Sequence, residues 1–117
     1  MKKHIILSAT LLMLLLLSYC GSARRGQPLY TPLDTSSPAV AQGEVVFMAH
    51  CNKCHPGGEA GLGPAINNKP LPGFLIRTQV RKGLGVMPAF KEDHISDQEL
   101  DNLVAYLKEL RSAKNKN

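Results

Sequence analysis

Apolar side chains near the C-terminus recur at the spacing of one face of an α-helix. The stripe consists of Leu100, Leu103, Val104, Leu107 and Leu110. Ser96 and Glu99 precede it as a capping box, and Ile95 and Leu100 are placed to form the hydrophobic staple of a helix start. We therefore predict a helix that begins at about residue 97 and ends near Ser112.

Another helix is predicted in the first half of the chain. Ser37 and Pro38 suit the N-cap and the first position of a helix that we expect to extend to about Cys54. Its inward positions include Gly43 and, one turn later, Phe47. Because a Gly inside a helix costs about 1 kcal/mol relative to Ala, Gly43 is a candidate for the close approach of a second helix.

The segments between these helices contain loops and one short helix. Residues 56–72 hold four Gly and four Pro in 17 positions, which disfavours regular structure and predicts a compact loop with a function. A short helix is expected from Phe74 to Lys82, ended by Gly83, and residues 83–90 form a second loop. The predicted fold class is therefore all-α, with three main helices and long loops.

The N-terminus has the composition of a bacterial export signal. Lys2 and Lys3 precede an apolar run, residues 5–17, that is too short for a comfortable membrane span. We predict a signal peptide over residues 1–19, of the lipoprotein type. The mature protein is then expected on the periplasmic side of a bacterial membrane.

Cys20 has a separate predicted role. Residues 17–21 resemble a lipobox, in which this cysteine becomes the lipidated first residue of the mature protein, although Tyr19 stands where the pattern has a small residue. Cleavage within residues 21–23 would instead release a soluble periplasmic protein, and an uncleaved leader would remain as a signal anchor.

The remaining chain is divided by composition. Residues 20–37 are predicted to be a lipid-anchored flexible tether, residues 38–112 the folded domain, and residues 113–117 a basic C-terminal tail. The formal charge of +5 falls to +3 without Lys2 and Lys3. Since no basic stripe is interleaved with aromatic residues, we predict no binding of nucleic acid.

Cys51, Cys54 and His55 form a C-x-x-C-H motif at the end of the first predicted helix. This spacing is typical of covalent attachment of a c-type haem. Two thiols can each add to a vinyl group on one edge of a porphyrin, and the adjacent imidazole then lies under the ring. We predict one haem c, bound through Cys51 and Cys54, with His55 as an iron ligand.

Two other uses of a cysteine pair suit the sequence less well. A structural zinc site has four ligands, but the chain lacks a second pair, His4 falls in the leader and His50 is crowded against Cys51. A thioredoxin-like dithiol needs strands alternating with helices, and no run of this chain has that pattern.

The iron also needs a sixth ligand or an open position. Met87 lies 32 residues after His55 in a Gly-rich loop, and Pro88 restricts it to extended geometry. Met48 is too near the motif to reach the opposite haem face, and His94 lies in a charged stretch that we expect to be exposed. Met87 is therefore the predicted ligand, since Met and His together ligate the iron of many c-type haems.

Residues 38–111 resemble class I c-type cytochromes, the small all-α electron carriers with one haem. The matching blocks occur in the same order: Gly43-x-x-x-Phe47, Cys51-x-x-Cys54-His55, Gly63-Pro64, Met87-Pro88-Ala89-Phe90, and Leu103 with Tyr106. The resemblance implies the small cytochrome c fold, with three main helices and long loops wrapped around one covalently bound haem.

Further residue roles are implied by this resemblance. The Pro64 carbonyl is expected to accept a hydrogen bond from the His55 ring, which orients the ring and raises its basicity. Met87 is expected to be the distal ligand. The crossing of the terminal helices is expected to bring together Gly43, Phe47, Leu103 and Tyr106.

The predicted function is one-electron transfer between redox proteins, with no enzyme activity of its own. An apolar surround would exclude water from the haem; its candidates are Leu62, Ile66, Leu75, Val86 and Phe90. Basic residues could surround the exposed haem edge and steer an acidic partner, or serve solubility only; they are Lys53, Lys69, Arg81 and Lys82.

Two alternatives stay open. The chain could be a cytochrome subunit of a larger dehydrogenase or oxidase, and therefore part of a respiratory complex instead of a monomer. It could also be a haem protein with five-coordinate iron that binds a small ligand, and the role of Met87 distinguishes that case.

Overall fold

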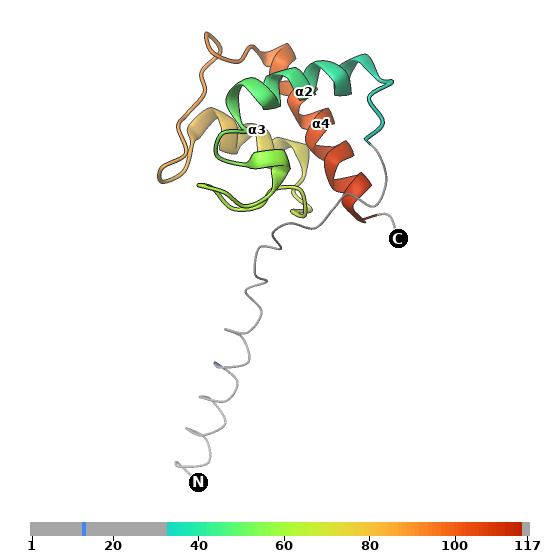
Figure 1. Cartoon of the computed structure of the whole chain (residues 1–117). Helices are drawn as coiled ribbons and strands as arrows, with labels where there is room; N and C mark the ends of the chain where they lie inside the picture. The colour runs from blue at the N-terminus through green and yellow to red at the C-terminus, as the bar shows by residue number, and fades with distance from the viewer. Residues whose placement is uncertain (1–12, 14–32, 116–117) are drawn as a thin grey trace.

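The computed structural model describes Met13 and residues 33–115, whose arrangement is drawn in Figure 1. This part of the chain is helical, which confirms the all-α prediction, and the signal peptide, Cys20 and most of the tether lie outside it. Among the described residues, none of the helices combines the length and hydropathy of a membrane span. The elements are α2 (Pro38–His50), the 3₁₀ helix η1 (Pro56–Gly58), α3 (Gly73–Lys82) and α4 (Asp97–Asn115).

Helix α2 begins where the sequence predicts. Ser37 is its N-cap and Pro38 its first residue, but the Ser37 side chain makes no capping hydrogen bond. The Ser37 carbonyl instead accepts the first backbone bond of the helix, from the Ala41 amide at 3.0 Å. The fixed φ of Pro38 suits the first turn, where its missing N–H costs nothing.

Helix α2 ends earlier than predicted, at His50 instead of about Cys54. Residues 51–54 form turns, and the Cys54 and His55 amides both donate to the Cys51 carbonyl, at 3.1 and 2.9 Å. The helical pattern did not reveal this change because the apolar positions continue up to the motif. The two cysteines therefore lie on a turn that follows the helix.

Helices α2 and α4 cross at Gly43, and Figure 1 shows α2 lying across the red α4. A Cβ on Gly43 would lie 2.0 Å from the Asn102 carbonyl oxygen and 2.8 Å from the Tyr106 Cβ. The Phe47 and Tyr106 rings pack beside this point, with centroids 5.1 Å apart. The close approach explains why a helix-breaking residue stands here, and it confirms the predicted crossing.

The start of α4 has the predicted capping box. The Ser96 amide donates to the Glu99 carboxylate at 2.8 Å, and the Glu99 amide donates to the Ser96 hydroxyl at 3.3 Å. Ile95 and Leu100 are both buried, as a hydrophobic staple requires. These paired bonds satisfy amides that the first turn of a helix leaves without a partner.

Helix α4 extends beyond the predicted end at Ser112 and reaches Asn115. Ala113 is fully buried, so the packed face of the helix continues past Leu110 by one more turn. The predicted basic tail of residues 113–117 therefore begins inside the helix. A single Ala gave no apolar signal strong enough to extend the stripe.

The long loop between the motif and α3 is folded on itself. The Gly58 carbonyl accepts from the Ile66 and Asn67 amides, at 2.8 and 3.1 Å. The buried Asn67 side chain donates to the Glu59 carboxylate at 2.9 Å. At the far end, Arg111 of α4 donates to two loop carbonyls, at residues 69 and 71. The loop is compact, as its length and composition predict.

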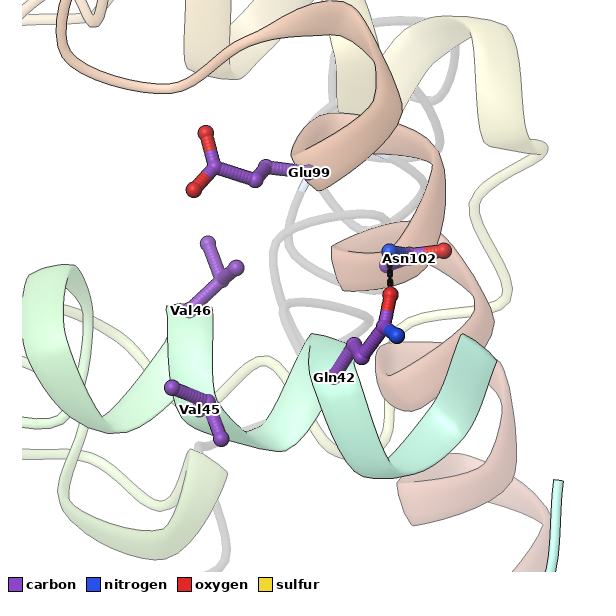
Figure 2. Close-up of a pocket in the computed structure, with 5 residues that line it drawn as sticks. All are labelled: Gln42, Val45, Val46, Glu99 and Asn102. Carbon is purple, nitrogen blue, oxygen red and sulfur yellow. Dashed lines mark hydrogen bonds between the residues drawn. The ribbon is translucent and has the colours of Figure 1, made fainter. Parts of the chain in front are cut away.

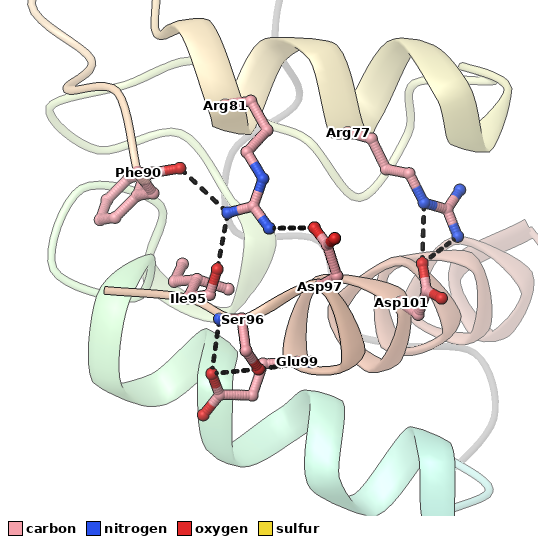
Figure 3. Close-up of polar contacts among 8 residues, drawn as sticks. All are labelled: Arg77, Arg81, Phe90, Ile95, Ser96, Asp97, Glu99 and Asp101. Carbon is pink, nitrogen blue, oxygen red and sulfur yellow. Dashed lines mark hydrogen bonds and ion pairs between the residues drawn. The ribbon is translucent and has the colours of Figure 1, made fainter. Parts of the chain in front are cut away.

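Helix α3 is joined to α4 by two arginine side chains (Figure 3). Arg77 donates through Nε to the Asp101 carboxylate at 2.8 Å. Arg81 donates through Nη2 to the Asp97 carboxylate at 2.6 Å. The loop of residues 83–96, orange in Figure 1, connects the end of α3 to the start of α4.

Candidate haem site

The C-x-x-C-H motif lies on the turn that follows α2. Cys51 and Cys54 carry free thiols and are half-buried, and Cys51 packs against the hydrophobic core. Burial raises the pKa of the Cys51 thiol to about 11, with a smaller contribution from the charge of Cys54. The Cys51 thiol is therefore protonated near neutral pH. Asn52 stabilises the turn, because its Oδ1 accepts from the Gly57 amide at 2.8 Å.

The His55 ring is buried and held by one hydrogen bond. Its Nδ1 lies 2.8 Å from the Pro64 carbonyl oxygen. A carbonyl can only accept, so Nδ1 carries the proton and donates. The other ring nitrogen, Nε2, then keeps its lone pair, which is the form that an imidazole needs in order to bind a metal. This contact is the one that the family resemblance implies for Pro64.

Gly63 brings the loop against the His55 ring. A Cβ at Gly63 would lie 2.3 Å from the ring Cε1, a distance that leaves no room for a side chain. The Gly63 amide donates to the Cys54 carbonyl at 2.9 Å, which ties the loop to the motif. The ring is therefore fixed on one side by backbone and oriented through Pro64.

Met87 lies in a tight turn of the second loop. The Leu84 amide donates to the Met87 carbonyl at 3.2 Å, and the Met87 amide donates to the Leu84 carbonyl at 3.0 Å. The Met87 side chain packs against the hydrophobic core, as Cys51 does. Its sulfur lies 3.8 Å from Nε2 of Gln79 on α3. His94, the competing ligand, is exposed and lies 3.2 Å from the Asp93 carboxylate.

Large apolar side chains remain exposed in three segments around this site: the long loop, the first turn of α3 and the turn that contains Met87. They are Leu62, Leu71, Phe74, Leu75, Leu84 and Val86. Val86 is 96% exposed and Leu62 is 78% exposed. Several such side chains together can form an apolar surface for a ligand. A porphyrin-sized apolar group is the kind of ligand that such side chains can cover, so the residues present fit a haem.

The predicted apolar surround is only partly enclosed by protein. Ile66 and Phe90 are partly buried and pack against the core. Leu62, Leu75 and Val86 are exposed. Protein packing alone therefore buries the first group and leaves the second group open to contact with a ligand.

Three polar residues of this region make contacts that the sequence did not predict. Gln79 contacts the Met87 sulfur, Asn52 holds the motif turn, and Arg81 binds the carbonyls of Phe90 and Ile95. All three contacts depend on how separate segments meet, and none belongs to a spacing pattern. The predicted steering role of Arg81 is affected, because its guanidinium is engaged within the fold.

A surface pocket lies elsewhere, between α2 and α4 (Figure 2). It has a volume of about 260 Å³ and is lined by Gln42, Val45, Val46, Glu99 and Asn102. The Asn102 amide donates to the Gln42 side-chain oxygen at 2.8 Å across it. None of the predicted site residues lines this pocket, so the haem chemistry is not assigned to it.

The chain has recognisable relatives. Residues 38–107 match the family described as cytochrome c oxidase, cbb3-type, subunit III. Cytochrome c6 of Bryopsis maxima is 36% identical over 75 residues, which cover 56% of this chain and 84% of that relative. Cytochrome c6 of Gloeothece citriformis is 36% identical over 85 residues, covering 62% of this chain and 76% of the relative.

A third relative belongs to an enzyme complex by its name. The 4-cresol dehydrogenase (hydroxylating) cytochrome c subunit of Pseudomonas putida is 34% identical over 68 residues. The match covers 58% of this chain and 59% of that subunit. No solved structure is significantly similar to the chain.

Proposed function

Since this chain belongs to the c-type cytochrome family described as cytochrome c oxidase, cbb3-type, subunit III, we propose that its haem iron is held between His55 and Met87 while it carries one electron at a time. The family and the cytochrome c6 relatives make the chain an electron-transfer protein with covalently bound haem c, not an enzyme. The observation that best supports the proposal is the hydrogen bond between His55 and the Pro64 carbonyl, which prepares His55 to bind the iron.

Cys51 and Cys54 would attach the haem, and His55 would ligate its iron. When bound, the haem supplies an iron that accepts and releases one electron. His55 offers Nε2 because Nδ1 donates to Pro64, and that donation fixes the ring and raises its basicity. Gly63 allows the loop to lie against one side of the ring, which limits the movement of the imidazole.

Met87 is the distal ligand in this proposal. Thioether sulfur favours the reduced iron and raises the potential relative to a second His. Met87 is held by the turn that it forms with Leu84 and by its packing on the core. Its side chain is therefore in position before the haem is bound. A preformed position of this kind keeps the structural change that accompanies each electron transfer small.

The redox partners of the chain approach the exposed edge of the site. Lys53, Lys69 and Lys82 are exposed and free to attract an acidic partner. Arg81 is withdrawn from this role because it binds Asp97 and two carbonyls. The steering charge is therefore assigned to the three lysines.

We also propose that the protein is exported and held at the periplasmic side of a bacterial membrane through a lipid on Cys20. The support is the sequence pattern of residues 1–21 alone. Intact-mass measurement of the membrane fraction tests it: a chain that begins at a diacylated Cys20 is expected. A mature chain that begins at Arg24 would overturn the anchor and leave electron transfer unaffected.

A second candidate role is that of a subunit in a larger dehydrogenase or oxidase. It is favoured by the description of the matching family and by the name of the Pseudomonas putida relative. Purification from membranes in mild detergent distinguishes the two roles. A free carrier elutes alone, whereas a subunit elutes with its catalytic partner in fixed proportion.

Carbon monoxide tests the ligand set against a five-coordinate haem protein. If Met87 ligates the iron, carbon monoxide finds no open position. The absorbance spectrum of the reduced holoprotein is then expected to stay nearly unchanged when the gas is added. Met87→Ala is expected to bind the gas readily. Rapid binding by the wild-type protein would contradict the proposed carrier mechanism.

A further inference from the structure

The guanidinium of Arg81 joins three separate parts of the chain (Figure 3). Nη1 donates to the Phe90 carbonyl at 3.1 Å and to the Ile95 carbonyl at 2.6 Å. Nη2 donates to the Asp97 carboxylate at 2.6 Å. A planar fork of fixed donors is suited to binding several acceptors at once.

These acceptors bracket the segment that follows Met87. Phe90 comes three residues after Met87, and Ile95 comes two residues before the start of α4. Arg81 itself lies in the last turn of α3. One side chain therefore ties the end of α3 to both ends of residues 90–95 and to the first residue of α4.

Other contacts fasten the same loop near Arg81. The Phe90 amide donates to the Val80 carbonyl at 2.9 Å, using an acceptor that the end of a helix leaves without a partner. The Phe90 ring contacts His50 edge to face, with centroids 5.9 Å apart. Phe90 is thus the point at which the loop is attached to both α3 and α2, and Arg81 holds its carbonyl.

We propose that Arg81 is a positioning residue that keeps the loop of residues 83–96 closed, with Met87 in place to bind the iron. The proposal rests on the assignment of Met87 as the distal ligand. Arg81 does not touch the ligand; it lowers the fraction of molecules in which the loop opens and Met87 leaves. The Arg81 side chain is 22% exposed and that of Asp97 is 78% exposed, so water weakens their ion pair. The bonds from Arg81 to the Phe90 and Ile95 carbonyls are partly buried and are weakened less.

Arg77 provides a matched control. It lies one turn earlier on α3 and joins the same two helices through Asp101. No hydrogen bond connects it to residues 83–96 among the described contacts. Its side chain is more exposed, at 41%. Loss of Arg77 therefore removes a link between α3 and α4 and leaves the loop attached.

Imidazole added to the ferric holoprotein measures loop opening. It binds only where Met87 has left, so its apparent dissociation constant varies inversely with the open fraction. Arg81→Ala is expected to lower that constant about tenfold, because it removes charged hydrogen bonds to two partly buried carbonyls. Arg77→Ala is expected to change it by less than about twofold.

Arg81→Lys is the second variant, for the case in which Arg81→Ala fails to take up haem. A lysine keeps the charge but cannot present the fork to all three acceptors, so its imidazole affinity is expected to lie between those of wild type and Arg81→Ala. Wild-type affinity in every Arg81 variant that takes up haem, with Met87 still ligated in wild type, would overturn the positioning role. Equal increases in imidazole affinity in Arg77→Ala and Arg81→Ala would also overturn it. The loss of contact between α3 and α4 would then explain the opening of the loop.

The same titration separates the two proposals. The wild-type ferric spectrum is recorded before imidazole is added. If it lacks the absorbance band of a Met-to-iron bond, the distal-ligand assignment fails, and the role of Arg81 fails with it. If the band is present and the variants behave alike, only the role of Arg81 fails.

Discussion

Gly63 lies so close to His55 that a Cβ on the glycine would reach within 2.3 Å of the imidazole Cε1. The Gly63 backbone therefore limits the position of the imidazole on one side. The Pro64 carbonyl, 2.8 Å from Nδ1, sets the rotation of the ring. Two consecutive residues of the loop control the orientation of the His55 ring, the proposed proximal ligand. Substitutions at this point are expected to act on the haem before they act on the fold.

Gly63→Ala is expected to displace the His55 ring or the loop. The ferric absorbance spectrum and the reduction potential should both change, because the imidazole can no longer keep its position. Gly57→Ala is the control, since Gly57 has φ of 59° and nothing within 4 Å of its Cβ position. That variant should lose about 1–2 kcal/mol of stability through backbone strain and keep the wild-type spectrum. Identical spectra for both variants would show that the Gly63 backbone does not limit the position of the His55 ring.

Gly43→Ala tests the crossing of α2 and α4. Helix propensity alone predicts that Ala stabilises this position by about 1 kcal/mol. The overlap with the Asn102 carbonyl predicts the opposite sign, a loss of about 1–3 kcal/mol or more through overpacking. Denaturant unfolding of the holoprotein measures the difference. A variant more stable than wild type would show that α2 and α4 can move apart without a loss of stability, and would contradict the close crossing.

Glu99 gives the stability of the domain an acid dependence. Hydrogen bonds from the Ser96 amide and hydroxyl hold its pKa below the ordinary value of 4.5. The folded state therefore binds this proton less readily than the unfolded state, so the contribution is present above the unfolded pKa and is lost as pH falls through the folded pKa. Glu99→Gln should flatten the fall in unfolding free energy below about pH 4.5, and Ser96→Ala, which removes the hydroxyl but keeps the backbone amide, should flatten it less. The double variant should flatten it no further than Glu99→Gln does alone, and independent, additive effects would contradict the capping box.

The sequence predicted the local features of the fold more accurately than the contacts between segments. The capping box and the apolar stripe of α4 are periodic signals within one element, and the structure confirms both. The end of α2 at His50 depends on turns that the motif adopts, so periodicity placed it too late. Gly43 was recognised because its helical cost needed a reason, whereas Gln79 and Arg81 resemble ordinary polar residues of a helix until α3 meets the second loop.

The haem is expected to be required for folding. Leu62, Phe74, Leu84 and Val86 are all more than half exposed in the protein alone, and a domain of this length has little other core to offset the entropy of ordering its loops. The variant with both Cys51→Ala and Cys54→Ala, expressed without the leader, should give a largely unfolded far-ultraviolet circular dichroism spectrum. A cooperative thermal transition of this haem-free chain would show that the helices suffice.

The central claim is that Met87 is the distal ligand of the iron, and the ferric absorbance spectrum tests it most directly. The wild-type holoprotein should have the weak band near the red end of the spectrum that a Met-to-ferric-iron bond produces. Met87→Ala should lose the band, and Met48→Ala, which removes an exposed methionine of α2, should retain it. A wild-type spectrum without the band, or a band that survives in Met87→Ala, would contradict the account.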